Sequence, residues 1–342
     1  MINTFILSRG ISGGVEKVAK IGMPLLLLFG VILAVTGITL EAKPGGAIND
    51  GLVGLNYLWS PDFSSIWSFK VWVAAAGQIF FTLSLGMGSI HCYASYLNAK
   101  EDIALNAMTA GWMNEFVEVV LGSAIIIPIS VGFLGIDAIS EMVSGGSGLG
   151  IGFAVLPQLF SSWGWFGTLS GLMWFGLLFF AGITSSMAMG TPLIGFMRDN
   201  FSWKDKQGAY LFGALIFVFG IPTVLSQDAF NEYDYWAGTV SLVVFAMVEI
   251  VLFAWVLGMD KAWDEITRGA DIKVPLIFKY VIKYVSPVFL IIVFVGALPD
   301  IIKNATAPTS FYGWLGRAML LILFIGIAVL VSVAKRKQLK SK

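Results

Sequence analysis

Eight long apolar stretches dominate this sequence of 342 residues, and they restrict it to folds that a lipid bilayer can surround. A bilayer core about 30 Å thick is crossed by a helix of about 20 apolar residues. We therefore predict an all-α, polytopic membrane protein with about eight membrane-spanning helices in a single domain, residues 1–342. The expected spans are approximately Ala19–Leu40, Val71–Leu97, Ile103–Phe133, Trp165–Met197, Tyr210–Val224, Tyr235–Leu257, Val281–Leu298 and Gly313–Val333.

Composition excludes several other classes of protein. Hydrophobic residues make up 57% of the chain and charged residues 12%, whereas soluble domains carry about 25% charged residues. The formal net charge of zero gives no indication of a nucleic-acid partner. One cysteine, Cys92, and one histidine, His91, exclude a disulfide framework and argue against a Cys/His metal centre.

The distribution of positive charge predicts the orientation in the membrane. With both termini placed in the cytoplasm, 17 of the 21 Lys and Arg residues fall on the cytoplasmic side. The four that fall outside are Lys43, Lys70, Lys303 and Arg317.

Three connecting segments are long enough to carry structure of their own. Two are outer loops, Glu41–Lys70 and the glycine-rich Gly135–Gly164, and loops of such length are often functional lids. The third is the charged inner loop Asp260–Lys279, in which we expect a short helix.

The second span carries glycine and hydroxyl residues in the middle of an apolar stretch. Thr82 and Ser84 are two residues apart, which suits an extended backbone better than one helix face. Gly86 and Gly88 allow the helix to break, and broken backbone at membrane depth is tolerated where it lines a cavity or lies buried in protein. The alternative is an unbroken helix that packs on its neighbours through small residues.

Ionisable residues within other spans indicate function. Asn114 and Glu118 are four residues apart in the third span and share a helix face, whereas Glu115 is rotated away from them. A charge at that depth costs at least about 2.5 kcal/mol, so the pair indicates an ion site or a proton path, unless it is a structural hydrogen bond between helices. Glu249 in the sixth span also needs a partner, which the sequence does not identify.

The fourth span places a cluster of oxygen atoms on one side of a helix. Ala181 and Ser185 share a face, with Thr184 beside them. Hydroxyl groups in membrane helices often bond back to their own carbonyls. The alternative is a set of neutral oxygen ligands, which hard cations such as sodium prefer.

Four strings occur in order along the chain: GQIFFTLSLGMG, MNEFVEVVLG, FFAGITSS and DYWAGT. Together they resemble the neurotransmitter:sodium symporter family, especially its bacterial, leucine-transporter-like members, over essentially the whole chain. The resemblance implies helices five to twelve of a twelve-helix fold whose first ten helices form two inverted repeats. The chain would then hold the second inverted repeat and two extra C-terminal helices, and would lack the first four helices.

The resemblance also implies roles for single residues. The substrate pocket would be lined by Phe81, Thr82, Ser84, Met87, Ser185 and Met189. One sodium ion would be bound by Thr82 and Asn114, and a second by the Ala181 carbonyl, Thr184 and Ser185. Glu118 matches a carboxylate that stands in for chloride in chloride-independent members, where its protonation can accompany the return step.

The remaining implied residues belong to gates and a hinge. Asp234 at the outer gate and Asp199 at the inner gate would each pair with an arginine of the absent helices, and Tyr96 would support the inner gate. Gly14 and Pro24 match a helix-five motif whose unwinding lets water reach the second sodium.

The implied function is sodium-coupled symport of an amino acid into the cell by alternating access, across the plasma (inner) membrane. Sodium would be co-transported, no organic cofactor is expected, and a homodimer is possible. Met87 and Met189 replace Phe and Ile of some relatives, and because methionine repacks readily, this favours hydrophobic amino acids, aromatic ones included.

Two other hypotheses come from different classes. One is a non-transporting fragment or incomplete gene model, since the first four helices are absent. The other is an intramembrane enzyme using Glu115 and Glu118, which is disfavoured because no nucleophile–base pair or metal triad is visible.

Overall fold

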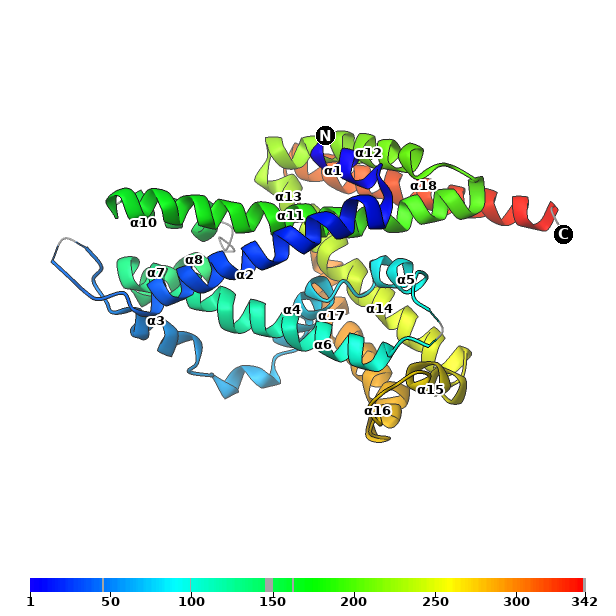
Figure 1. The fold of residues 1–342 in the computed structure, drawn as a ribbon, viewed down its shortest axis with the longest axis horizontal. Helices are drawn as coiled ribbons and strands as arrows, with labels where there is room; N and C mark the ends of the chain where they lie inside the picture. The colour runs from blue at the N-terminus through cyan, green and yellow to red at the C-terminus, as the bar shows by residue number, and fades with distance from the viewer. Residues whose placement is uncertain (45, 99, 145–149, 162, 341–342) are drawn as a thin grey trace. The chain divides into compact units, whose positions relative to one another are not determined.

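The structure is a computed structural model of the chain, and it describes residues 1–44, 46–98, 100–144, 150–161 and 163–340 (Figure 1). All secondary structure in these ranges is helical, which confirms the all-α class. Within them, seven helices are long and apolar enough to cross a membrane. They are Gly13–Ile38, Ile103–Leu134, Gly164–Phe201, Asp205–Leu225, Gln227–Val256, Ile277–Thr306 and Phe311–Lys340. The remaining expected span, the second along the chain (Val71–Leu97), is divided between two shorter helices.

The chain forms two compact units, each assembled from separate segments. The first unit comprises Met1–Val15, Ser64–Thr109 and Ser186–Lys342. The second comprises Glu16–Phe63 and Ala110–Ser185. Two continuous helices, α6 (Ile103–Glu115) and α11 (Gly164–Phe201), contribute residues to both units.

The second unit is built around α7, which packs against α2 and α3. Its buried core includes Leu33, Ile129, Leu156 and Phe160, and the Trp174 indole donates a buried hydrogen bond to the Gly152 carbonyl (2.8 Å). Its elements, besides parts of α6 and α11, are α2 (Glu16–Ile38), α3 (Gly51–Leu58), η3 (Phe116–Gly122), α7 (Ser123–Leu134), α8 (Ile136–Ser144), η4 (Ile151–Val155) and α10 (Leu156–Ser161).

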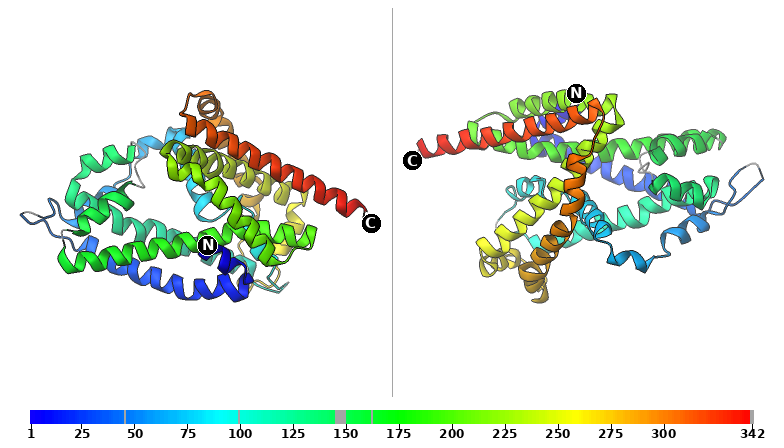
Figure 2. Two further views of the ribbon diagram at one scale, coloured as in Figure 1. Left: turned by 90° about the horizontal axis from the view of Figure 1, so that it is seen from above. Right: turned by 180° about the vertical axis from the view of Figure 1, so that it is seen from behind.

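The first unit contains the C-terminal helices, of which α18 ends at the C-terminus of the described chain (Figure 2). In it α14 packs against α4 and α17, and α13 packs against α18. Its elements besides α6 and α11 are α1 (Ile2–Leu7), η1 (Ile11–Val15), α4 (Phe69–Thr82), α5 (Ser89–Ala94), α12 (Asp205–Leu225), α13 (Gln227–Tyr233), η5 (Asp234–Ser241), α14 (Leu242–Val251), η6 (Leu252–Val256), α15 (Met259–Thr267), α16 (Ile277–Tyr280), η7 (Val281–Val285), α17 (Ser286–Thr306) and α18 (Phe311–Lys340). A further 3-10 turn, η2 (Phe63–Trp67), precedes α4.

The segments expected to be loops contain short helices. The first outer loop holds α3 and η2, and the second holds α8, η4 and α10. Three of the glycines noted in the second loop, Gly145, Gly146 and Gly148, lie outside the described residues. The short helix expected in the inner loop is confirmed as α15, which buries Met259, Ala262 and Trp263.

One carboxylate fixes the start of α6 and gives a pH prediction. Asp102 accepts hydrogen bonds from the backbone N–H groups of Leu105 and Asp271, both at 2.8 Å. The bond from Leu105, and to a smaller extent that from Asp271, lowers the pKa of the Asp102 carboxyl below its usual range. A lowered folded-state pKa contributes stability above the unfolded value, and this is lost as pH falls through the folded-state pKa. We expect hydrogen-exchange protection of both amides to fall below about pH 4, while D102N lowers it at every pH.

Candidate functional site

The second span is broken in the structure, which decides between the two alternatives that the sequence left open. Helix α4 ends at Thr82, residues 83–88 are not helical, and α5 begins at Ser89 (Figure 1). Gly86 and Gly88 have φ of +73° and +75°, in the left-handed region that glycine adopts readily. Ser84 also lies there, with φ of +56°, which is unusual for a residue with a side chain.

A carboxylate from another helix supports the break. The Gly86 N–H donates to Oε2 of Glu249 on α14 at 3.2 Å, and the other carboxylate oxygen lies 3.7 Å from Nδ1 of His91. This supplies the partner that Glu249 needs at membrane depth. The contact between Gly86 and Glu249 could not be predicted from the sequence, because its donor is a backbone N–H and a sequence pattern identifies only side chains.

Four of the expected substrate-lining residues lie at this break. Phe81 and Thr82 are the last residues of α4, and Ser84 and Met87 lie in the non-helical segment. Thr82, Ser84 and Met87 are half-buried, and the Thr82 hydroxyl donates to the Ile79 carbonyl at 3.3 Å. Met189 belongs to the same unit and is exposed, on α11.

The second unit carries the hydroxyl cluster of α11. The Thr184 hydroxyl donates to the carbonyls of Phe180 (2.8 Å) and Ala181 (3.1 Å). This is the local back-bonding that the sequence allowed. Because the proton points at carbonyls, the oxygen lone pairs stay free to accept from a cation. Ala181 is half-buried and Ser185 is exposed, one helical turn apart.

The polar pair of the third span also lies in the second unit. Asn114 is on α6, and its side-chain amide donates to Glu118 Oε2 at 3.4 Å. The shared face expected from the four-residue spacing is therefore present. Glu118 lies in η3, a π-helical turn, and such turns inside α-helices frequently occur at functional sites.

The expected gate residues have different surroundings. Asp234 begins η5 and is exposed. Asp199 accepts a hydrogen bond from Arg198 Nε (3.1 Å), and the Tyr96 hydroxyl accepts one from Arg198 Nη1 (2.6 Å). The pairing of Asp199 with an arginine of the absent helices stays a prediction, and within this chain Arg198 contacts both expected inner-gate residues. Arg198 was missed because it was counted only among the positive charges of one membrane face.

The two residues expected to form a hinge lie in η1 and in α2. Gly14 lies in the π-helical turn η1, so close to the Ile6 carbonyl that a side chain at this position would collide with it. Pro24 lies inside α2, where it removes one helical hydrogen bond.

Comparisons with known proteins agree on a transporter. The profile of the Sodium:neurotransmitter symporter family matches residues 1–342. A sodium-dependent transporter of Methanocaldococcus jannaschii is 31% identical over 98% of this chain and 66% of its own length. The sodium-dependent nutrient amino acid transporter 1 of Drosophila persimilis is 26% identical over 94% of this chain and 49% of its own length.

A solved structure has the same fold. The crystal structure of MhsT in complex with L-phenylalanine superposes with a TM-score of 0.73 at 27% identity, covering 86% of this chain and 66% of MhsT. The chain thus spans just under two thirds of the length of the archaeal relative and of MhsT. Because the family profile covers every residue from 1 to 342, the chain belongs to the sodium:neurotransmitter symporter family.

Proposed function

We propose that this chain forms helices five to twelve of a sodium-coupled symporter that carries a hydrophobic amino acid into the cell by alternating access. The observation that carries the proposal is the break between α4 and α5. Around it, backbone N–H and C=O groups leave the helical pattern at membrane depth, which is tolerated where they line a cavity or are buried in protein. A zwitterionic amino acid needs such donors and acceptors.

The side chains at the break suit an amino acid with an apolar side chain. Thr82 and Ser84 offer hydroxyl groups, whereas Phe81, Met87 and Met189 offer apolar surface. Methionine adapts its shape to different partners. We therefore propose a substrate pocket made by these residues together with Ser185. The phenylalanine bound to MhsT is consistent with that substrate class.

We propose sodium as the coupled ion because the residues expected at the two ion sites offer neutral oxygen atoms. Thr82 and Asn114 would bind one ion, and the Ala181 carbonyl with Thr184 and Ser185 a second. Glu118 would supply a fixed negative charge or carry a proton on the return step. Each ion biases the cycle only by its different affinity for the two states.

The positions of the gates and the membrane orientation are part of the same proposal. Asp234 would serve the outer gate, Asp199 and Tyr96 the inner gate, and Gly14 with Pro24 the hinge. The excess of Lys and Arg on one side supports cytoplasmic termini in the plasma (inner) membrane.

Replacing the α11 hydroxyls tests the sodium proposal. In the transporter assembled in liposomes, the T184A/S185A double variant is expected to raise the sodium concentration for half-maximal amino-acid uptake by about tenfold or more, because hydroxyl ligands are lost. T223A is a matched control, because Thr223 also bonds back to its own helix, through the Gly220 carbonyl (2.8 Å). Unchanged sodium dependence in T184A/S185A would contradict the assigned ligands.

A non-transporting fragment is the second candidate, favoured by the 66% coverage of the archaeal relative. Two samples separate the candidates: liposomes holding the 342-residue chain, and liposomes holding the chain joined to the first four helices of that relative. Sodium-driven uptake of a hydrophobic amino acid in the second sample alone supports the symporter assembled from both parts. Amino-acid uptake that does not depend on the sodium gradient in either sample would reject sodium-coupled symport.

A further inference from the structure

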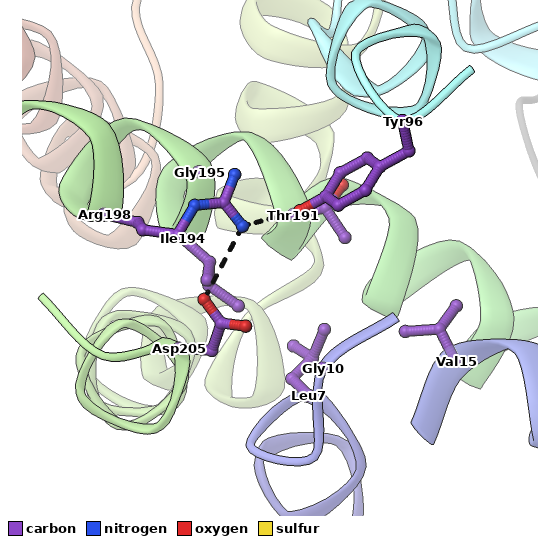
Figure 3. A pocket seen from close by; sticks show the side chains of 9 residues that line it. All are labelled: Leu7, Gly10, Val15, Tyr96, Thr191, Ile194, Gly195, Arg198 and Asp205. Atoms are coloured by element: carbon purple, nitrogen blue, oxygen red, sulfur yellow. Dashed lines mark hydrogen bonds and ion pairs between the residues drawn. The ribbon is translucent and has the colours of Figure 1, made fainter. Parts of the chain in front are cut away.

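Arg198 lies in the last turn of α11 and lines a small pocket in the first unit (Figure 3). The other lining side chains come from α1, η1, α12 and the segment after α5, besides α11 itself. The Arg198 side chain is 36% exposed. Its guanidinium group can therefore change partners without crossing a packed core.

The present partners of Arg198 tie two helices together. Nη1 donates to the Tyr96 hydroxyl at 2.6 Å, and Nε donates to Asp199 at 3.1 Å. The guanidinium carbon also lies 5.6 Å from the centre of the Tyr96 ring. Tyr96 follows α5 in a turn in which its N–H donates to the Tyr93 carbonyl. The arginine thus holds the end of α5 against the end of α11.

A second acceptor lies next to the first and forms an ion pair with Arg198, but no hydrogen bond. Asp205, in the first turn of α12, has its Oδ1 atom 3.8 Å from Arg198 Nη1, beyond hydrogen-bonding distance. This oxygen is shielded from solvent and accepts no hydrogen bond from the described residues. Figure 3 shows Nη1 between the Tyr96 hydroxyl and the Asp205 carboxylate. A shielded carboxylate oxygen without a donor is unfavourable.

We infer that Arg198 is a two-position latch, which exchanges the Tyr96 hydroxyl for the Asp205 carboxylate and thereby releases α5 from the end of α11. Release loses a hydrogen bond to a neutral hydroxyl and gains one to a carboxylate, which is the stronger kind. The hydrogen bond that Arg198 loses from Tyr96 is therefore compensated. The arrangement with Arg198 bound to Tyr96 and the one with Arg198 bound to Asp205 are then close in free energy. The latch is a positioning device that goes beyond the proposed transport function and rests on contacts within the first unit.

Cys92 provides a built-in reporter. It is the only cysteine in the sequence, it lies on α5, and its Sγ is 3.4 Å from where a Cβ on Gly195 of α11 would lie. Separation of α5 from α11 exposes this thiol. The rate at which a charged methanethiosulfonate reagent labels Cys92 therefore reports release, in the 342-residue chain in lipid nanodiscs without sodium or substrate.

Removal of the Tyr96 acceptor and weakening of the Asp205 acceptor are expected to change the rate of Cys92 labelling in opposite directions. Y96F removes the present acceptor and should speed labelling about fivefold, and R198Q should do the same. D205N weakens the alternative acceptor and should slow labelling about twofold. In the Y96F background D205N should have little further effect, because α5 is already released. R198K, which keeps the charge but not the planar fork, should fall between the wild type and R198Q.

Two controls address general destabilisation. R268Q removes an exposed arginine paired with Glu265, and D228N removes an acidic residue from the first turn of α13. Both should label at the wild-type rate. Acceleration by D205N comparable to that by Y96F would show a purely structural cluster and overturn the latch, as would wild-type rates for all of Y96F, R198Q and D205N. Because the assay contains no transported solute, its outcome is separate from that of the uptake experiments.

Discussion

Replacing Arg317 with alanine is expected to lower the free energy of unfolding by about 3–5 kcal/mol, because it leaves the Glu232 carboxylate shielded and unpaired. Arg317 on α18 donates to both Glu232 oxygens at 2.8 Å, and the two side chains are only 15% and 12% exposed. The same guanidinium donates to the carbonyls of Asn304 and Ala305, near the end of α17, each at 3.0 Å. One side chain therefore joins α13, α17 and α18.

The measurement is thermal or denaturant unfolding in detergent micelles, followed by tryptophan fluorescence. K20A is the matched control, because Lys20 pairs with Glu16 on the surface of α2 with side chains 73% and 48% exposed, and such pairs contribute about 0–1 kcal/mol. The double variant R317M/E232L should be more stable than R317A, since it leaves no uncompensated charge. A loss below about 1 kcal/mol for R317A would show that solvent reaches Glu232 freely.

The membrane-spanning helices could be predicted because their signal is local. Length and apolarity decide whether a segment crosses a bilayer, and the expected span Ile103–Phe133 differs from the observed Ile103–Leu134 by one residue. The fifth span differs more, because the expected Tyr210–Val224 is observed as a helix that starts five residues earlier, at Asp205. The helix break was visible as a possibility because Gly86 and Gly88 are themselves residues of the pattern.

The contacts that hold these elements could not be predicted, because they join residues far apart in sequence. Arg317 looked like one of four outer-side cations, and its pair with Glu232 spans 85 positions. Tyr96 and Arg198 are 102 positions apart. The partner of Glu249 is the Gly86 backbone N–H, which is free to donate to a side chain only because the helix breaks there. Spacing identifies which residues share a helix face, but not which face meets another helix.

The second large effect is expected at that break, where G86A should destabilise the chain by about 2–5 kcal/mol. Gly86 has φ of +73°, and a residue with a Cβ pays about 1–2 kcal/mol in that region. An added Cβ would also lie 2.8 Å from the Leu242 carbonyl oxygen and 3.1 Å from the Ala246 nitrogen, both backbone atoms of α14. Overpacking against atoms that cannot rotate away adds about 1–3 kcal/mol.

Gly88 is the control that separates the two causes. Its φ of +75° is almost the same, but a Cβ there would meet only Pro192, at 3.7 Å, which is ordinary contact. G88A should therefore cost only the conformational term of about 1–2 kcal/mol, measured by the same unfolding assay. A larger loss in G86A than in G88A shows that α14 supports the break by close backbone approach, in addition to the bond from Gly86 to Glu249. Equal losses would mean that the break can move away from α14, and that left-handed backbone geometry alone fixes glycine at both positions.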